Sequence, residues 1–118
     1  MEFQKTKESA AREVALAFGV PPMLLGFPGD KSYSNYQEAN RAFYRLTVLP
    51  IVAKTMEAVT GWLGPLFGKG LVLKADIDGI PALAAEREAQ WRRISAAEFL
   101  TTAEKRQMLG LPKLAEDE

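Results

Sequence analysis

The fold is decided by residues 34–62, whose sequence is SNYQEANRAFYRLTVLPIVAKTMEAVTGW. Apolar residues recur every three or four positions along the whole stretch, which is the period of an amphipathic helix. Ser34 and Gln37 have the spacing of a capping box with Asn35 between them, so we expect a loop–helix cap at these residues and a helix that starts there. A helix from Asn35 to about Trp62 is roughly 40 Å long at 1.5 Å per residue.

Pro50 lies inside this helical pattern. A proline has no N–H to donate to the Leu46 carbonyl, and its ring crowds the preceding turn. We therefore expect one long helix with a kink at Pro50, rather than two separate helices.

A second amphipathic helix is expected upstream, over residues Glu2–Phe18. Gly19 can supply the left-handed cap at its C-terminus, and the proline pair that follows prevents the helix from continuing. A single turn closed by Gly26 then leads into a loop over residues 27–34. Because loops often carry function, this loop is the first place to look for a binding site.

The sequence downstream of the long helix predicts one strand and two short helices. Residues Leu71–Ile77 alternate apolar and polar in the manner of a half-buried strand. No second convincing strand exists in the sequence, so this one is expected to pair with a segment outside the chain or with another copy. Pro81 suits the first turn of a third helix, and Thr101 opens a fourth with capping-box spacing.

Composition excludes several classes of function. The chain has 118 residues, no Cys, no His and equal numbers of acidic and basic residues, 15 of each. The missing thiols and imidazoles argue against a transition-metal enzyme or a catalytic triad, so no catalytic residue, cofactor or metal is expected. Zero net charge provides no general attraction to nucleic acid. Consecutive apolar residues fall far short of a membrane span, and no membrane partner is expected.

Three local patterns leave alternatives open. Asp76 and Asp78 could present two carboxylates to a hard cation, or they could belong to an ordinary strand exit. The charged residues 86–93 suit a solvated helix face with pairs such as Glu88 to Arg92, or a subunit interface. Tyr33 could stack on a base, because it lies in the loop rather than on a helix face.

Five blocks of sequence, in order, resemble the tailed-bacteriophage portal family, in the branch that gene transfer agents also use. The first is AREVALAFGVPPMLLG at 11–26, which is similar to the family's helix that ends in an Ala-Phe-Gly-Val-Pro-Pro block with a Leu-Leu-Gly turn. The others are YSNYQEA at 33–39, FYRLTVLP at 43–50, DID at 76–78 and TTAEKRQMLGLP at 101–112. Together they cover nearly the whole chain.

The resemblance implies a mainly helical piece of a larger α+β portal subunit, from its C-terminal part. By this resemblance, residues 1–26 are the end of a stem helix and a turn, 27–34 a tunnel-type loop, and 35–63 a long wing-type helix. Residues 64–79 are a turn and the strand, 80–114 crown-type helices, and 115–118 an acidic tail. The loop residues expected to face DNA are Asp30, Lys31, Ser32 and Tyr33.

Portal proteins form rings, usually of twelve subunits, at one capsid vertex, and they have no catalytic residues of their own. The resemblance therefore implies a structural protein of a virion or transfer-agent particle, present in the bacterial cytoplasm during assembly. Its expected partners are other copies of itself, double-stranded DNA that passes through without sequence-specific contact, terminase, and capsid and head–tail connector proteins. The alternative is a small helical DNA-binding transcriptional regulator that uses the helix pair of residues 81–114.

Overall fold

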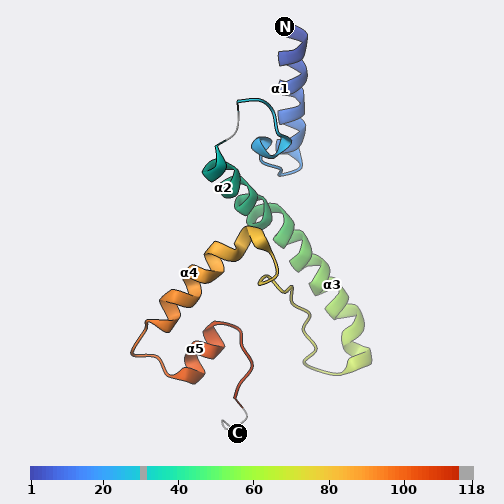
Figure 1. Ribbon diagram of the computed structural model, residues 1–118. Coiled ribbons are helices and arrows are strands. Elements are labelled where there is room, and N and C mark those ends of the chain that lie inside the picture. The colour runs from blue at the N-terminus through green and yellow to red at the C-terminus, as the bar shows by residue number, and fades with distance from the viewer. Residues whose placement is uncertain (30–31, 115–118) are drawn as a thin grey trace. The chain divides into compact units, whose positions relative to one another are not determined.

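The structure is a computed structural model that describes residues 1–29 and 32–114 (Figure 1). It divides into two compact units, Met1–Ile77 and Asp78–Glu118. The fold is mainly helical, as predicted. The first unit contains α1 (Glu2–Ala17), η1 (Pro22–Leu25), α2 (Tyr33–Phe43), η2 (Tyr44–Val48) and α3 (Leu49–Phe67). The second unit contains η3 (Pro81–Leu83), α4 (Ala84–Ser95) and α5 (Thr102–Met108).

The C-terminus of α1 confirms the predicted helix stop. Gly19 has φ 70° and donates its N–H to the Leu16 carbonyl at 3.0 Å. The Val20 N–H reaches back to the Ala15 carbonyl at 2.8 Å, which completes a Schellman motif. The single turn η1 follows, and Gly26 closes it with φ 77°. These caps satisfy helix carbonyls that would otherwise be left without a donor.

The end of α1 is held against the long helix by one close contact. The Thr47 hydroxyl donates a hydrogen bond to the Gly19 carbonyl at 2.5 Å. A Cβ atom at Gly19 would lie only 2.6 Å from the Thr47 Oγ1 atom. Glycine is therefore required at this position both by its positive φ and by the close approach of Thr47.

The long helix is present, but its bounds and its irregularity differ from those predicted. The helical run is continuous from Tyr33 to Phe67, so it begins earlier and ends later than expected. Single glycines inside a helix cost only about 1 kcal/mol each. The helix therefore continues past Gly61 and Gly64, and it ends before Gly68, whose φ is 94°.

The disturbance expected at Pro50 takes the form of a π-helical turn in the residues before it. In η2 the Leu49 N–H donates to the Tyr44 carbonyl, five residues back. Pro50 itself lies in the first turn of α3, where its missing N–H is tolerated. In the wider π-helical turn, a carbonyl that precedes the proline accepts a hydrogen bond from the N–H five residues later instead of four residues later.

The helical run Tyr33–Phe67 is also long and apolar enough to cross a membrane, by length and composition alone. The length of uninterrupted apolar runs in the sequence does not indicate this composition, because a few charged residues are spread along the helix. Core helices of soluble proteins reach the same length and apolar composition. None of the apolar window is buried in the described structure.

Residues 71–77 are extended, but they form no strand, and this corrects the predicted β-strand. No residue in the described parts of the chain, 1–29 and 32–114, is assigned to a β-ladder. A strand is defined by backbone bonds to a neighbour, and no neighbouring strand is available in these residues. The segment instead follows α3, where the Leu73 N–H donates to the Thr60 hydroxyl at 3.2 Å.

The second unit contains the two short helices that were predicted. Thr101 caps α5 in a full capping box with Glu104, as its spacing indicated. Beyond α5, the Leu111 N–H donates to the Arg106 carbonyl at 2.9 Å, and Gly110 adopts φ 72°. Between residues 78 and 114, the buried apolar side chains are Leu83, Ile94 and Leu109.

Candidate functional site

The loop singled out from the sequence is only partly described by the structure. Asp30 and Lys31 lie outside the described residues. Ser32 is the N-cap of α2, and its hydroxyl accepts a hydrogen bond from the Asn35 N–H at 3.3 Å. The cap is therefore Ser32 rather than Ser34, which lies inside the helix. Both serines have Ser/Thr-x-x spacing to a polar residue, so spacing alone could not distinguish them.

Tyr33 and Gln37 are brought together on the first turns of α2. The Gln37 amide donates to the Tyr33 hydroxyl at 3.0 Å, instead of reaching back to a backbone N–H. The Tyr33 side chain is 80% exposed, and its ring is therefore available to a partner. The expectation that Tyr33 lies in the loop was wrong, because Tyr33 is the first residue of α2, where its exposed ring follows the residues predicted to face DNA.

The other side of this loop is anchored to α1. The guanidinium of Arg12 lies over the ring of Phe27, 4.8 Å from its centroid. A cation over an aromatic face is an attractive arrangement, so Phe27 is held at the point where the loop begins. The Arg12 contact and the Ser32 cap therefore define the two ends of the loop.

Apolar side chains are widely exposed on both units. The large exposed apolar side chains of the first unit include Phe3, Val14, Leu16, Phe18, Leu46, Ile51, Trp62, Leu66, Phe67 and Val72.

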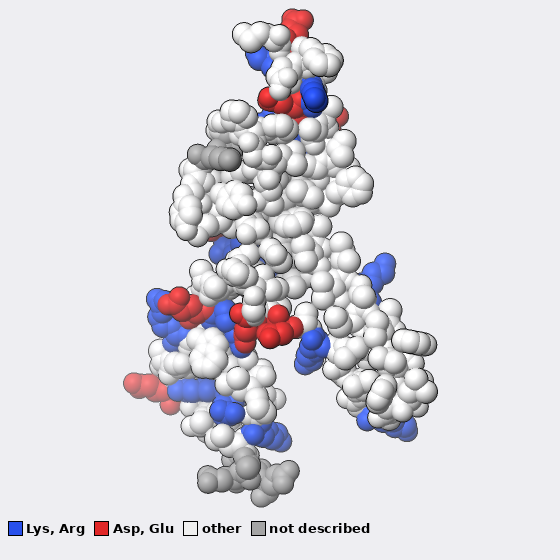
Figure 2. All heavy atoms as spheres, turned by 45° about the vertical axis from the view of Figure 1, so that its right-hand side comes forward, with Lys and Arg blue, Asp and Glu red and all other residues white. Residues whose placement is uncertain are grey.

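Charge does not cover these apolar faces. Figure 2 shows that the surface of α3 in view carries few charged groups, whereas charged side chains crowd α4. The first unit has one buried hydrophobic side chain, Ala15, among its described residues. A helix with an uncovered apolar face is stabilised when a partner removes that face from water. The exposed helices are thus surfaces for association.

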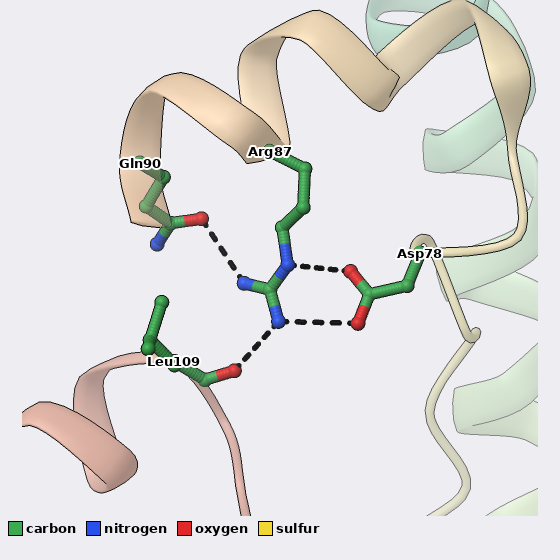
Figure 3. Close-up of polar contacts among 4 residues, drawn as sticks. All are labelled: Asp78, Arg87, Gln90 and Leu109. Atoms are coloured by element: carbon green, nitrogen blue, oxygen red, sulfur yellow. Dashed lines mark hydrogen bonds and ion pairs between the residues drawn. The ribbon is translucent and has the colours of Figure 1, made fainter. Parts of the chain in front are cut away.

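The second unit is organised around Arg87, which α4 presents toward the end of α5 (Figure 3). Its Nη2 atom donates to the Leu109 carbonyl at 2.8 Å and to an Asp78 oxygen at 3.1 Å, and Nη1 donates to Gln90 at 3.1 Å. The Nε atom lies 2.5 Å from the other Asp78 oxygen. That buried nitrogen makes no well-directed hydrogen bond, so its attraction to Asp78 is electrostatic.

Of the two alternatives left open for the charges of residues 86–93, the solvated helix face is wrong for Arg87. The Arg87 side chain is only 18% exposed. Its place one turn after Leu83 and two turns before Ile94, both buried, was the signal that could have found it. The predicted pair between Glu88 and Arg92 is confirmed, with 2.7 Å between its charged atoms.

The possible cation site at Asp76 and Asp78 is not supported. No group of three or more metal-binding side chains occurs among the residues that the structure describes. The Asp78 carboxylate faces the Arg87 guanidinium, which already neutralises it. A carboxylate paired in this way is a poor ligand for a hard cation.

Among the residues that the structure describes, the acid with a shifted pKa is Glu104 of the capping box. Hydrogen bonds from the Thr101 backbone N–H and hydroxyl stabilise its ionised form and lower its pKa from the ordinary value of 4.5. Its carboxylate oxygen lies 2.8 Å from the Thr101 nitrogen. The N-terminus of α5 therefore carries a fixed negative charge at neutral pH.

Comparison with known proteins identifies the family to which the chain belongs. Residues 1–110 match the family model described as phage portal protein. Proteins of unassigned function from Rickettsia felis and Rickettsia bellii are 47% and 46% identical to this chain over 114 residues. The chain is covered to 97%, but it spans only 30% of the length of each of these relatives.

Solved structures show the same similarity. A chain in the neck of a native gene transfer agent particle, computed with C12 symmetry, is 59% identical and has a TM-score of 0.77. A chain in the neck of an empty particle, computed with C6 symmetry, has the same identity and TM-score. Each match covers 97% of this chain but only 32% and 31% of the respective neck chain. The chain thus corresponds to about a third of those subunits.

Proposed function

Because this chain belongs to the phage portal protein family, we propose that it is part of a portal subunit, a structural rather than catalytic component of a phage or gene transfer agent particle. In this role it helps to form a ring at the capsid vertex, through which DNA is packaged and ejected. The ring also docks terminase during packaging and the head–tail connector afterwards.

One observation carries this proposal. The chain is 59% identical to a neck chain over nearly its whole length, and the two folds superpose with a TM-score of 0.77. That neck was computed with C12 symmetry, and it belongs to a gene transfer agent particle. Identity this high supports the same place in a comparable ring, with a particle as the location of the assembled protein.

The exposed surface supports ring assembly. A closed ring is built from a head-to-tail interface, in which two different faces of each subunit meet. The uncovered apolar faces of α1 and of the run Tyr33–Phe67 offer such surfaces. The membrane-like composition of the long helix is explained equally well by neighbouring subunits that cover it.

The loop that ends at Ser32, together with Tyr33 at the start of α2, is the proposed DNA-facing element. It is bounded by the anchored Phe27 and the capped start of α2, and Tyr33 stands exposed at its end. DNA must slide through a portal, so strong phosphate clamps and base recognition would both hinder passage. Zero net charge and a single lysine in the loop, Lys31, suit weak contact that ignores sequence.

The test compares the solution mass of this chain with that of the longest reading frame that contains it, by light scattering after size exclusion. A large ring from the long form, with the short form monomeric or aggregating, supports the portal proposal. A stable dimer of the short form, with no longer frame upstream, contradicts it and favours the regulator.

The regulator hypothesis is disfavoured by the start of α5. A recognition helix points its N-terminal residues at DNA. Here that position holds the ionised Glu104, which would face phosphates of the same sign. A regulator would bind duplex DNA as a dimer with affinity that falls steeply as salt increases, whereas this chain is expected to bind duplex DNA poorly.

A further inference from the structure

The turn between α4 and α5 presents an exposed aromatic side chain on a rigid support (Figure 1). Phe99 lies in this turn and is 87% exposed. The Lys105 ammonium donates a hydrogen bond to the Ser95 carbonyl at 3.0 Å, which ties α5 to the end of α4. The capping box of Thr101 fixes the chain just beyond the turn. A side chain on a fixed turn requires little further ordering of the backbone when it binds, so Phe99 is well placed to anchor a partner.

A pocket of about 460 Å³ lies along α5 and the segment that follows this helix. The Arg106 guanidinium donates to the Pro112 carbonyl at 3.0 and 2.8 Å, and the Leu111 N–H donates to the Arg106 carbonyl at 2.9 Å. These bonds fold the segment back against the helix, so the walls are in place before anything binds. The described residues that line the pocket are Ala103, Arg106, Gln107, Gly110, Leu111 and Lys113.

The pocket combines apolar surface with two positive charges. Ala103 and Leu111 provide apolar surface, and Arg106 and Lys113 provide the charges. Neither cation forms an ion pair with an acidic side chain of residues 1–29 or 32–114. A guanidinium held in place by a carbonyl also attracts the face of an aromatic ring. The pocket therefore favours an aromatic side chain that has an acidic residue beside it.

Glu98 and Phe99 have this chemistry. Both are exposed, and neither of them lines the pocket of its own chain. We propose that Phe99 of one subunit enters the pocket of the next subunit in the ring, where Glu98 faces the cations Arg106 and Lys113. This inference rests on the proposed function, and it names a contact by which neighbouring subunits of the ring recognise each other.

A second copy of this chain suits the pocket because the turn and the pocket are different surfaces of the same unit. A contact between unlike surfaces leaves one turn and one pocket free at the ends of each pair, so it repeats from subunit to subunit until a ring closes. The neck that contains the 59% identical chain was computed with C12 symmetry, which is a closed ring of this kind. A contact between two like surfaces would stop at a dimer.

Cross-linking in the ring of the long form tests which surfaces meet. These 118 residues contain no cysteine, so thiols can be introduced one at a time. Ala97→Cys lies two residues before Phe99, and Gln107→Cys lies in the pocket. With a short bis-maleimide, the double variant should give covalent dimers, trimers and larger multimers on a denaturing gel, and each single variant should give no more than the parent. Dimers alone, or no multimers, overturn the head-to-tail contact.

Modification of the thiol in Gln107→Cys by a soluble maleimide measures whether Phe99 covers the pocket. In the ring, addition of Phe99→Ala should speed this modification at least about 10-fold, because truncation of an anchoring aromatic side chain weakens a contact by that factor or more. The matched control is Ala89→Cys, which is exposed on α4 and does not line the pocket. Its rate of modification should not change when Phe99→Ala is added.

A charge exchange supplies variants that keep the aromatic anchor. Glu98→Lys places two positive charges together, and Lys113→Glu places two negative charges together. Because like charges repel across an interface, each change alone should speed modification of the thiol at position 107 at least about threefold. The double variant restores opposite charges, so its rate should return to within about twofold of the parent. Effects of the two changes that simply add would overturn this pairing.

The outcomes separate this contact from the proposed function. If the ring forms and Phe99→Ala leaves the modification rate at position 107 unchanged, the inference is overturned while the proposed function stands. A long form that makes no ring contradicts the proposed function. In that case, multimers from the double cysteine variant would still support the contact between turn and pocket, and their absence would overturn it as well.

Discussion

Replacement of Arg87 by methionine should destabilise the second unit by about 2–3 kcal/mol. The hydrogen bond to the Leu109 carbonyl is charge-assisted and lies beside a buried side chain, and bonds of this kind contribute about 1.5–3 kcal/mol. The Asp78 partner is 51% exposed, so its ion pair is screened and adds only about 0.2–1 kcal/mol. Methionine keeps most of the aliphatic stem, so little apolar packing is lost.

The fluorescence of Trp91 offers a local assay. The Arg87 guanidinium lies 5.7 Å from the centre of its ring, and the chain has one other tryptophan, Trp62. In a Trp62→Phe background, urea unfolding followed at Trp91 reports on the second unit. At an m value of about 1 kcal/mol/M, the expected loss of about 2–3 kcal/mol lowers the midpoint by about 2–3 M.

A matched control separates the contacts from the loss of a positive charge on α4. Arg93→Met removes an exposed arginine from the same helix, and its midpoint should stay within about 0.5 M of the parent. Arg87→Lys keeps the charge but loses the fork that reaches Asp78 and Leu109 together, so its midpoint should fall between those of the parent and Arg87→Met. If Arg87→Met shifts the midpoint no more than Arg93→Met, Arg87 does not organise the unit.

Three further predictions follow from single positions. Because the pKa of Glu104 is lowered in the folded state, its ionised form stabilises α5 fully above pH 4.5 and progressively less as pH falls through the folded-state pKa. Glu104→Gln should remove this pH dependence from the urea unfolding midpoint measured by Trp91 fluorescence. Gly19→Ala should lower the stability of the fold by about 2 kcal/mol or more, because the new Cβ meets the Thr47 hydroxyl and the backbone has positive φ. Thermal unfolding followed by circular dichroism measures this, and an unchanged unfolding midpoint would contradict the contact. Lys31→Glu should alter DNA packaging or ejection in assembled particles and leave folding of the chain unchanged; normal DNA passage, or unfolding of the variant, would count against the loop as a DNA-facing element.

Local signals in the sequence were sufficient for most element ends. The α1 stop at Gly19 and the capping box of Thr101 depend on backbone geometry within a few residues, so neighbours along the chain determine them. The five sequence segments that resemble the portal family are also short and continuous, so they can be recognised without the structure. The start of the long helix was misplaced by two residues because Ser32 and Ser34 both satisfy the local rule, and the geometry of the preceding loop selects Ser32.

Other features depend on groups distant in sequence, and only the tertiary structure decided them. The sequence suggested a solvated face or a subunit interface for Arg87, yet its partners Asp78 and Leu109 lie 9 and 22 residues away within the chain. The requirement for glycine at position 19 comes partly from Thr47, 28 residues further along. Hydrogen bonds of this kind depend on where the fold brings two segments, which periodicity and composition do not encode. The sequence by itself determined a mainly helical chain, because helix periods and caps depend on neighbouring residues, and the structure decided which distant charges and backbone groups the fold brings together.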